Sequence, residues 1–218
     1  MAISLAGPLA LSFDKKVAFY KKWRFLFPAM LFPAIFYIIW DSLFTQWGVW
    51  SFNDLYITGI KFLHLPIEEI MFFFVVPYCC VFIYECIRCY FPGIVDAKWA
   101  GILFRVLTVI LLLAGLFFIK RMYTGTTFLF LSATFLIFMT RRTFSKYINL
   151  AVFFISYAII LIPFLVVNGF LTAIPVVLYN DTENLGIRIY SIPFEDVFYG
   201  MLLIFLNIFI FEWLRNRR

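Results

Sequence analysis

Six long apolar runs constrain this chain more than any other feature. They cover residues 25–44, 70–90, 100–119, 126–140, 148–178 and 195–213. A helix needs about 20 apolar residues to cross the hydrocarbon core of a bilayer, and most of these runs reach that length. Because 65% of the chain is hydrophobic and only 14% is charged, no stretch is left for a separate soluble domain. The sequence therefore predicts an all-α integral membrane protein folded as one helical bundle.

A shorter apolar stretch precedes these runs. Residues 1–13, MAISLAGPLALSF, contain Pro8 and are too few to span a bilayer core of about 30 Å. A secretory signal peptide is not favoured, because no charged segment opens the stretch and no small-residue cleavage site closes it. We expect the stub of a seventh helix, which gives six to seven transmembrane helices.

Lysine and arginine predict the orientation, because loops rich in these residues resist translocation. Thirteen of them fall on the side of the segment before the first full helix, and four fall on the other side. The larger set is Lys15, Lys16, Lys21, Lys22, Arg24, Arg88, Lys98, Arg141, Arg142, Lys146, Arg215, Arg217 and Arg218, and the smaller is Lys61, Lys120, Arg121 and Arg188. We expect a multi-pass cell-membrane protein whose larger basic set and C-terminus are cytoplasmic. Arg105 lies inside a run, where a long basic side chain typically reaches back to the headgroups.

Polar residues recur at a constant separation of 127 positions, which predicts an internal duplication. The matched pairs are Tyr20/Tyr147, Thr45/Thr172, Asn53/Asn180, Gly59/Gly186, Lys61/Arg188, Pro66/Pro193, Glu68/Glu195, Glu69/Asp196, Glu85/Glu212 and Arg88/Arg215, with Asp41/Asn168 a near match. Chance similarity among apolar residues would not align proline, glycine, acidic and basic positions in one register. We expect a 3+1+3 parallel repeat, with a first three-helix repeat at 1–95, a linking transmembrane helix at 96–122 and a second repeat at 123–218.

Two motifs, PIEE at 66–69 and PFED at 193–196, each place adjacent acids at the start of an apolar run. Proline and one acid are typical of a helix start, because proline lacks an N–H and acids favour the positive end of the helix dipole. Capping does not account for a second acid in both repeats, since paired carboxylates at a membrane boundary repel and lose solvation. We interpret the four acids, Glu68, Glu69, Glu195 and Asp196, as a polar functional site, with capping alone as the alternative.

Other reactive groups are scarce in the sequence. His64 is the single histidine, and the four cysteines, Cys79, Cys80, Cys86 and Cys89, lie on one helix, which favours packing over metal binding. The chain has no glycine-rich dinucleotide fingerprint and no nucleophilic serine elbow, so we predict no cofactor and no metal. Nucleic-acid binding is not expected, because the basic residues separate apolar runs and form no patch interleaved with aromatics. The carboxylates are left as the reactive groups, and acid–base catalysis is the chemistry they perform.

Three segments carry a resemblance to a known family. IIWDSLFTQWGVWSFNDLYITG (38–59), LPIEEIMFFFVVPYCCVFIYE (65–85) and IPFEDVFYG (192–200) resemble the membrane-integral, flavin-independent lycopene cyclases in their fused form. The resemblance extends from Ser12 onward, and the short N-terminal stretch departs from it. It implies an isomerase of carotenoid biosynthesis that converts a lipid-soluble polyene, lycopene, to γ-carotene and then β-carotene without net redox change.

The resemblance also implies a role for each acid. Glu68 and Glu195 are expected to be the principal catalytic carboxylates, one protonating a terminal double bond and one removing a ring proton. Glu69 and Asp196 are expected to share a proton with them, because two close carboxylates do not both ionise easily. Asp41 is expected to relay the proton or to orient these groups.

Other side chains are expected to support the reaction or the fold. Aromatic faces stabilise a cation without trapping it, and the candidates are Trp40, Phe72, Phe73, Phe198 and Tyr199. Lys61 and Arg188 are candidates either to pair with the acids or to anchor the helices at the interface. Glu85 with Arg88, and Glu212 with Arg215, have the i,i+3 spacing of intrahelical ion pairs.

Two functions from other classes stay open. A 3+1+3 arrangement also suits a small transporter, although the polar residues here concentrate at one end and do not line a path. A carotenoid-binding protein without catalysis is the second alternative, although binding an apolar polyene needs no paired acids. Also left open are the ring type, the number of ends cyclised, an elongated carotenoid as substrate, the number of pockets, and assembly into a homo-oligomer.

Overall fold

The computed structural model describes residues 2–95, 97–141, 144 and 146–217. Arg142 and Arg218, which entered the predicted orientation, and the predicted domain limits at Met1 and Asp96, lie outside these residues. Within them, each of the six apolar runs forms a helix long and apolar enough to cross a membrane, as expected. These helices are α2 (Trp23–Gln46), α3 (Ile67–Tyr90), α4 (Lys98–Phe117), α5 (Met122–Thr140), α7 (Leu150–Ala173) and α8 (Glu195–Asn216). The N-terminal stub forms the short helix α1 (Ala2–Leu11), which packs on α3.

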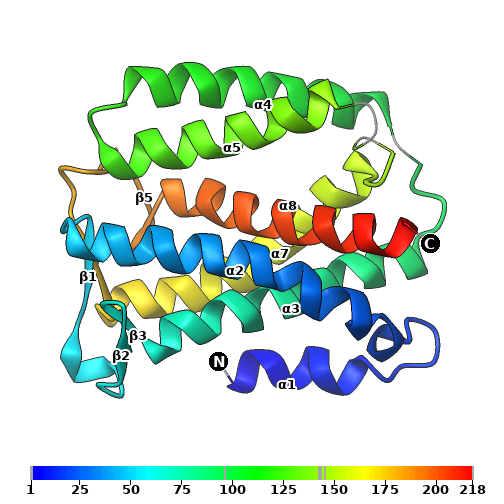
Figure 1. Cartoon of the computed structure of the whole chain (residues 1–218), viewed down its shortest axis with the longest axis horizontal. Helices are drawn as coiled ribbons and strands as arrows, with labels where there is room; N and C mark the ends of the chain where they lie inside the picture. The colour runs from blue at the N-terminus through cyan, green and yellow to red at the C-terminus, as the bar shows by residue number, and fades with distance from the viewer. Residues whose placement is uncertain (1, 96, 142–143, 145, 218) are drawn as a thin grey trace.

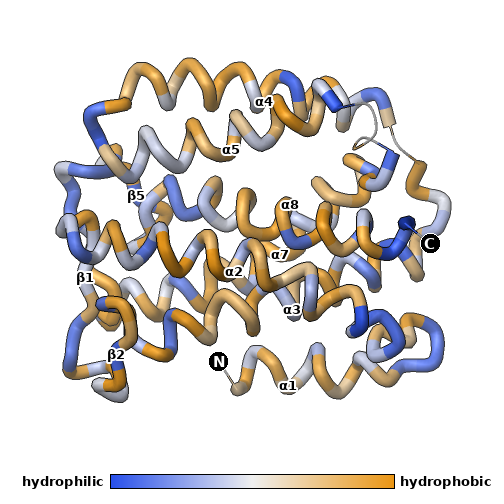
Figure 2. Tube along the Cα trace, in the orientation of Figure 1, coloured by the Kyte–Doolittle hydropathy of each residue, from blue (hydrophilic) through white to orange (hydrophobic). Residues whose placement is uncertain are grey.

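The helices run lengthwise through one bundle, and the short strands gather at one of its ends (Figure 1). We call the end where α3 and α8 begin the motif end, and the end where they finish the basic end. Hydrophobic residues follow the helices and hydrophilic ones concentrate toward both ends (Figure 2), which is the distribution expected of a multi-pass membrane protein.

The sequence did not predict the strands, which are only two or three residues long. The apolar run at 148–178 ends as a helix at Ala173, because Pro175 lacks the N–H that a continuing helix would use. Beyond it, β4 (Val177–Tyr179) pairs antiparallel with β1 (Trp50–Phe52). Two hairpins complete the motif end: β2 (Lys61–Phe62) with β3 (Leu65–Pro66), and β5 (Arg188–Ile189) with β6 (Ile192–Pro193). Two 3-10 turns are also present, η1 (Phe19–Lys22) and η2 (Asp54–Tyr56).

Aromatic packing holds the bundle together. The Phe104 ring on α4 stacks on Phe135 of α5 with ring centroids 4.1 Å apart, and Phe205 of α8 packs 4.9 Å from Phe135. Helices α4 and α5 approach closely at Gly115, where an added Cβ would lie 2.9 Å from the Leu129 side chain. These contacts fix α8, which carries the second motif, against its neighbours.

At the basic end, buried ion pairs join α3 to α8. The predicted intrahelical pairs are confirmed, Arg88 lying 3.5 Å from Glu85 and Arg215 contacting Glu212. The same arginines also cross between helices, because Arg88 reaches Glu212 and Arg215 reaches Glu85, each at 2.9 Å. Lys22, just before α2, also pairs with Glu85. Glu85 and Glu212, the two buried carboxylates of this end, are therefore each paired with more than one basic side chain.

Equivalent residues of the two repeats, 127 positions apart, make related contacts at both ends of the bundle. Helices α2 and α7 begin at equivalent positions and also end at equivalent positions. The two strands β1 and β4 are equivalent as well, and they pair with each other. Beside them the Asn53 N–H donates to the Val176 carbonyl, and the equivalent Asn180 N–H donates to the Val49 carbonyl. Each repeat thus makes the same contact to the other, as in the crossed ion pairs at the basic end, and this reciprocity is typical of two-fold symmetry. It fits the division into 1–95, 96–122 and 123–218, which stays a prediction.

Candidate active site

A cavity of about 700 Å³ opens at the motif end and extends toward α1, which contributes Ser4 and Pro8 to its wall. Its wall is mostly apolar and comes largely from α3 and α7, with α2, α8, β1 and β4 closing the motif end. Besides Ser4, the polar side chains that reach it include Asp41, Glu68, Glu69, Asn168, Thr172, Asp196 and the tyrosines Tyr56, Tyr123, Tyr179 and Tyr199. Acids from both halves of the chain therefore face one cavity.

The first acid of each motif binds a loop. The Glu68 carboxylate accepts a hydrogen bond from the Thr58 backbone N–H at 2.8 Å, and Glu195 accepts one from the Leu185 N–H at 2.7 Å. Thr58 and Leu185 are themselves equivalent positions of the two repeats. The loops turn at Gly59 and Gly186, whose φ angles of +83° and +71° favour glycine.

Glu195 has a further partner and is fully buried. The Thr124 hydroxyl at the start of α5 donates to its Oε1 at 2.5 Å. The other carboxylate oxygen, Oε2, has no hydrogen-bond partner among the described residues in either Glu68 or Glu195. Glu195 does not line the cavity, whereas Glu68 reaches its edge.

The second acid of each motif faces the cavity, because adjacent helical residues point about 100° apart. Asp196 is buried and accepts hydrogen bonds on both oxygens, from the Tyr123 hydroxyl at 2.5 Å and from the Tyr179 hydroxyl at 2.9 Å. Its equivalent, Glu69, is half-buried, and within the described part of the chain no side chain or backbone group is hydrogen-bonded to its carboxyl.

Asp41 joins these two acids from α2. It is buried, accepts a hydrogen bond from the Tyr199 hydroxyl, and interacts electrostatically with Glu69 and Asp196. Among the described residues, none of the three carboxylates forms an ion pair. The cavity therefore holds three carboxyl groups whose charge no cation offsets at close range.

An aromatic cluster surrounds the acids. The Trp50 ring lies with its centroid 5.2 Å from Tyr123 and 6.1 Å from both Tyr179 and Tyr199, edge to face in each case. Burial, together with the neighbouring carboxylate of Asp196, raises the pKa of the Tyr179 phenol on β4 well above its ordinary value. Tyr179 therefore remains a hydrogen-bond donor at neutral pH.

A comparison with known protein families identifies the family to which this chain belongs. A family model described as lycopene cyclase matches residues 1–87 and 120–214, which together are most of the chain. The chain belongs to the lycopene cyclase family. It is therefore a membrane-embedded carotenoid cyclase. The ends of the two matched segments are equivalent positions of the two repeats, as the motifs are. No curated protein and no solved structure was found to match the chain.

The predicted aromatic residues of this lycopene cyclase divide into two groups. Phe72 and Tyr199 line the cavity. Trp40 lies behind Tyr199, with ring centroids 5.1 Å apart, and Phe73 packs 5.4 Å from Tyr37, so both support the wall without forming it. Phe198 does not line the cavity, and its ring centroid lies 5.1 Å from that of Phe128.

Lys61 and Arg188 do not partner the motif acids. In the lycopene cyclase structure, Lys61 pairs with Asp54 at 2.6 Å, and the equivalent Arg188 pairs with the equivalent Asp181. Both basic residues lie on the hairpins outside the helices, so the acids of the neighbouring loops are closer to their side chains than the motif acids are. Within the described residues, no group of three or more His, Cys, Asp or Glu side chains is arranged to hold a metal ion.

Sequence reasoning missed four residues of the cyclase site: Trp50, Tyr123, Thr124 and Tyr179. For Tyr179 a signal existed, because the spacing of the repeats aligns it with Phe52, just as it aligns Tyr199 with Phe72. A hydroxyl present in one repeat and absent from the other marks a position that the fold alone does not require. Trp50 lies in the segment 38–59 that carries the family resemblance, but Tyr123 and Thr124 lie in none of the quoted segments, and only the folded chain brings all three to the acids.

Proposed function

We propose that this lycopene cyclase is a β-cyclase that closes the linear ends of lycopene by proton-initiated, redox-neutral chemistry, giving γ-carotene and then β-carotene. The observation that carries the proposal is the convergence of Asp41, Glu69 and Asp196 on one apolar cavity. An apolar polyene offers such groups nothing to bind except its double bonds, and protonating a double bond is what a carboxylic acid in a dry cavity can do.

Glu69 is the proton donor in this proposal. No described group donates a hydrogen bond to its carboxyl, and two carboxylates stand nearby, which opposes the stabilisation of the anion by the start of α3. Carboxyl groups at close range cannot all ionise easily, and the one without donors keeps the shared proton. A neutral Glu69 beside the cavity is equipped to protonate a terminal double bond of lycopene.

Asp196 is the base. Two phenol hydrogen bonds favour its ionised form, because a hydrogen bond to a carboxylate stabilises the charge. The proton from Glu69 adds to the terminal double bond, the neighbouring double bond closes the ring by attacking the resulting tertiary cation, and Asp196 removes a ring proton to restore a double bond. One proton enters and one leaves, so no oxidant or reductant is consumed. Asp41 is suited to return the proton from Asp196 to Glu69.

The aromatic cluster suits the cationic intermediate. A ring face stabilises a nearby cation by about 0.5–2 kcal/mol and offers no strong nucleophile that would trap it. Trp50 contributes the largest such ring at the cavity, and its indole N–H has no partner among the described residues. The tyrosines that donate hydrogen bonds to Asp41 and Asp196 would have two roles, because their rings would also form part of the cation-stabilising surface.

Glu68 and Glu195 become positioning residues in this proposal. Each holds a loop backbone N–H that orders the turn before its helix, and the acid that follows it in sequence is thereby aimed at the cavity. We further propose that the basic end is cytoplasmic, because the basic residues concentrate there.

The test is to reconstitute the purified chain in vesicles, supply lycopene, and run the reaction in D₂O. We expect β-carotene with one solvent-derived deuterium per ring, because the exchangeable carboxyl proton of Glu69 ends up on ring carbon. Glu69→Gln should give no rings, while Phe198→Leu, away from the cavity, should cyclise normally. Unchanged lycopene with demonstrably folded protein would overturn the cyclase activity. Rings without deuterium would overturn a donor carboxyl that exchanges with solvent between turnovers, and ε-rings would overturn only the β assignment.

A further inference from the structure

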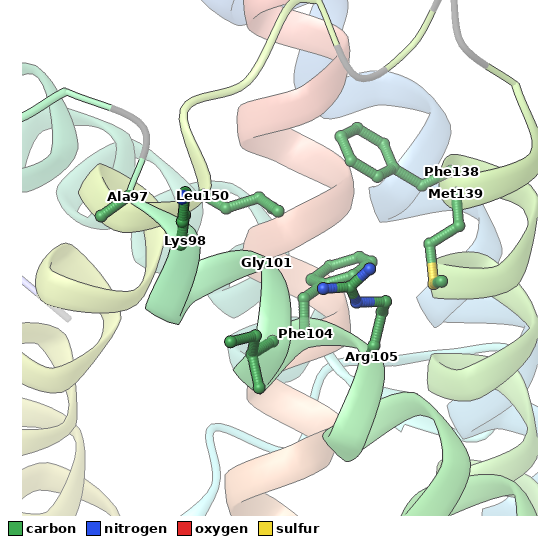
Figure 3. A pocket seen from close by; sticks show the side chains of 9 residues that line it. Ala97, Lys98, Gly101, Phe104, Arg105, Phe138, Met139 and Leu150 are labelled. Atoms are coloured by element: carbon green, nitrogen blue, oxygen red, sulfur yellow. The ribbon is translucent and has the colours of Figure 1, made fainter.

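A second cavity, of about 500 Å³ (Figure 3), lies at the basic end, far along the bundle from the motif acids. It opens between α4 and α5, beside the start of α7. The residues that matter for its use are Lys98, Gly101, Phe104, Arg105, Met139 and Leu150. It shares no residue with the cavity of the cyclase site.

Two cationic side chains stand at this cavity, both on α4. Lys98 and Arg105 are two helical turns apart, so they lie on the same face. Arg105 therefore sits about 10 Å further into the span than Lys98. Both side chains are exposed, which leaves their charged groups free to meet a ligand arriving from the membrane.

Arg105 differs from the three basic residues that pair with acids at this end. Lys22, Arg88 and Arg215 each pair with a buried glutamate. Among the described residues, none forms an ion pair or a hydrogen bond with the Arg105 or Lys98 side chain. An unpaired arginine inside a span is costly, so its charge is best met by an anion from outside the chain.

The rest of the cavity is apolar and shaped for a hydrocarbon chain. Phe104 is buried and forms its floor, and Met139 and Leu150 contribute its sides. Gly101 lies between the two cations, and a Cβ added there would meet nothing within 4 Å. Cations with an apolar groove between them, at the level of a membrane boundary, complement a lipid that carries a phosphate above an acyl chain.

We propose that this cavity binds an anionic phospholipid, with its phosphate held by Arg105 and Lys98 and an acyl chain lying along the groove at Gly101. The lipid closes the gap between α4 and α5 and stabilises the fold from the basic end. Because the cyclase site is not involved, the proposal stands or falls independently of the reaction.

The experiment titrates the purified full chain in detergent micelles with dioleoyl phosphatidylglycerol, and in parallel with dioleoyl phosphatidylcholine and inorganic phosphate. Thermal unfolding and native mass spectrometry report binding. The variants are Arg105→Gln, Lys98→Gln and Gly101→Leu, which fills the groove and keeps both charges. Lys15→Gln, which removes an exposed charge from the basic end away from the cavity, is the matched control.

We expect phosphatidylglycerol to raise the unfolding temperature more than phosphatidylcholine. Each charge-removing cavity variant should weaken its apparent affinity about fivefold, and Lys15→Gln should change it less than about twofold. Gly101→Leu should also lose bound lipid. Equal effects of the two lipids, or an equal loss with Lys15→Gln, would overturn the site. Inorganic phosphate binding as tightly and with the same dependence on Arg105, or full lipid binding by Gly101→Leu, would overturn phospholipid as the occupant.

Discussion

The two halves of the chain, compared position by position at the spacing of the repeats, keep the same contacts with the loops and differ where they meet the cavity. In each half the first acid of the motif accepts a hydrogen bond from a loop N–H, Thr58 to Glu68 and Leu185 to Glu195. The second acids are equally related, yet Asp196 receives two phenol hydrogen bonds and Glu69 receives none among the described residues.

One of the two donors to Asp196, Tyr179, is a substitution between the repeats, and the other, Tyr123, comes from α5. A second such substitution, Tyr199, donates to Asp41. Tyr179 and Tyr199 in the second half correspond to Phe52 and Phe72 in the first, and all four line the same cavity. Duplication supplies two carboxyl groups in similar places, and the hydroxyls make them unlike. A cyclisation that needs one acid and one base needs that inequality. The symmetric contacts therefore belong to the scaffold and the asymmetric ones to the chemistry.

The largest expected effect comes from the unlike acids themselves. Glu69→Gln and Asp196→Asn should each lower cyclisation by about 10² to 10⁴-fold, because each removes a general acid or base. Chromatography of pigments formed by equal amounts of folded protein measures this. Glu195→Gln, which changes the neighbour outside the cavity, should retain much more activity per folded molecule. Equal loss in Glu195→Gln and Asp196→Asn would return the principal role to the first acids.

Removing equivalent acids from the ion pairs at the basic end should destabilise the fold in either half of the chain. Glu85→Gln and Glu212→Gln each leave half-buried arginines without their full set of partners at the basic end. We expect either change to lower the free energy of unfolding by about 3 kcal/mol, since breaking a buried ion pair leaves an uncompensated charge. Activity per folded molecule should stay near that of the parent. Unfolding in denaturant at constant lipid composition measures the loss, which should be somewhat larger for Glu85→Gln because Lys22 also loses its partner. A loss confined to one of the two variants would contradict the symmetry.

Much of this fold could be predicted from sequence, because its determinants are local. The apolar runs gave all six spans, and the spacing of Glu85 with Arg88 gave an ion pair that the structure contains. The crossed pairs between α3 and α8 could not be predicted, since they depend on how two distant helices pack.

The site was predictable only in outline. The motif acids stood out because acids are rare in such a chain, but their side chains could not be ranked from sequence. Whether Glu68 or Glu69 faces the cavity depends on the rotation of α3, which the β2–β3 hairpin and the Thr58 loop fix. Tyr123 comes from α5 and reaches Asp196 across 73 positions, a contact that no local pattern signals.

The tyrosines offer a smaller and sharper test of the asymmetry. Tyr179→Phe and Tyr199→Phe make the second half resemble the first, where phenylalanine already stands. Each removes one hydrogen bond to a charged acid, so we expect cyclisation to fall about tenfold. The substitutions keep the ring, and the cation-stabilising surface should survive. Loss comparable to that of Asp196→Asn would mean that the hydroxyl itself transfers the proton, whereas no loss would remove the hydroxyls from the mechanism.

The smallest expected effect concerns the loop pair Asp181–Arg188, equivalent to Asp54–Lys61. Hydrogen bonds from Asn184 and Arg188 hold the pKa of the Asp181 carboxyl below its ordinary value of 3.8. Because the pKa is lowered on folding, this carboxylate contributes stability above the ordinary pKa and loses it as pH falls through the folded pKa. The side chain is largely exposed, so Asp181→Asn should cost less than about 1 kcal/mol at neutral pH.

The pH dependence separates that small electrostatic contribution from loop packing. The difference in unfolding free energy between parent and Asp181→Asn should shrink toward zero as pH falls below about 4 and through the folded pKa, because the parent carboxyl is then protonated. Asp54→Asn, measured in parallel, controls for the other acids that titrate in the same range, since both variants share them. A difference that persists at the acid end would mean that Asp181 acts through its hydrogen bonds to the loop. The pair would then belong with the uncharged contacts that both halves share.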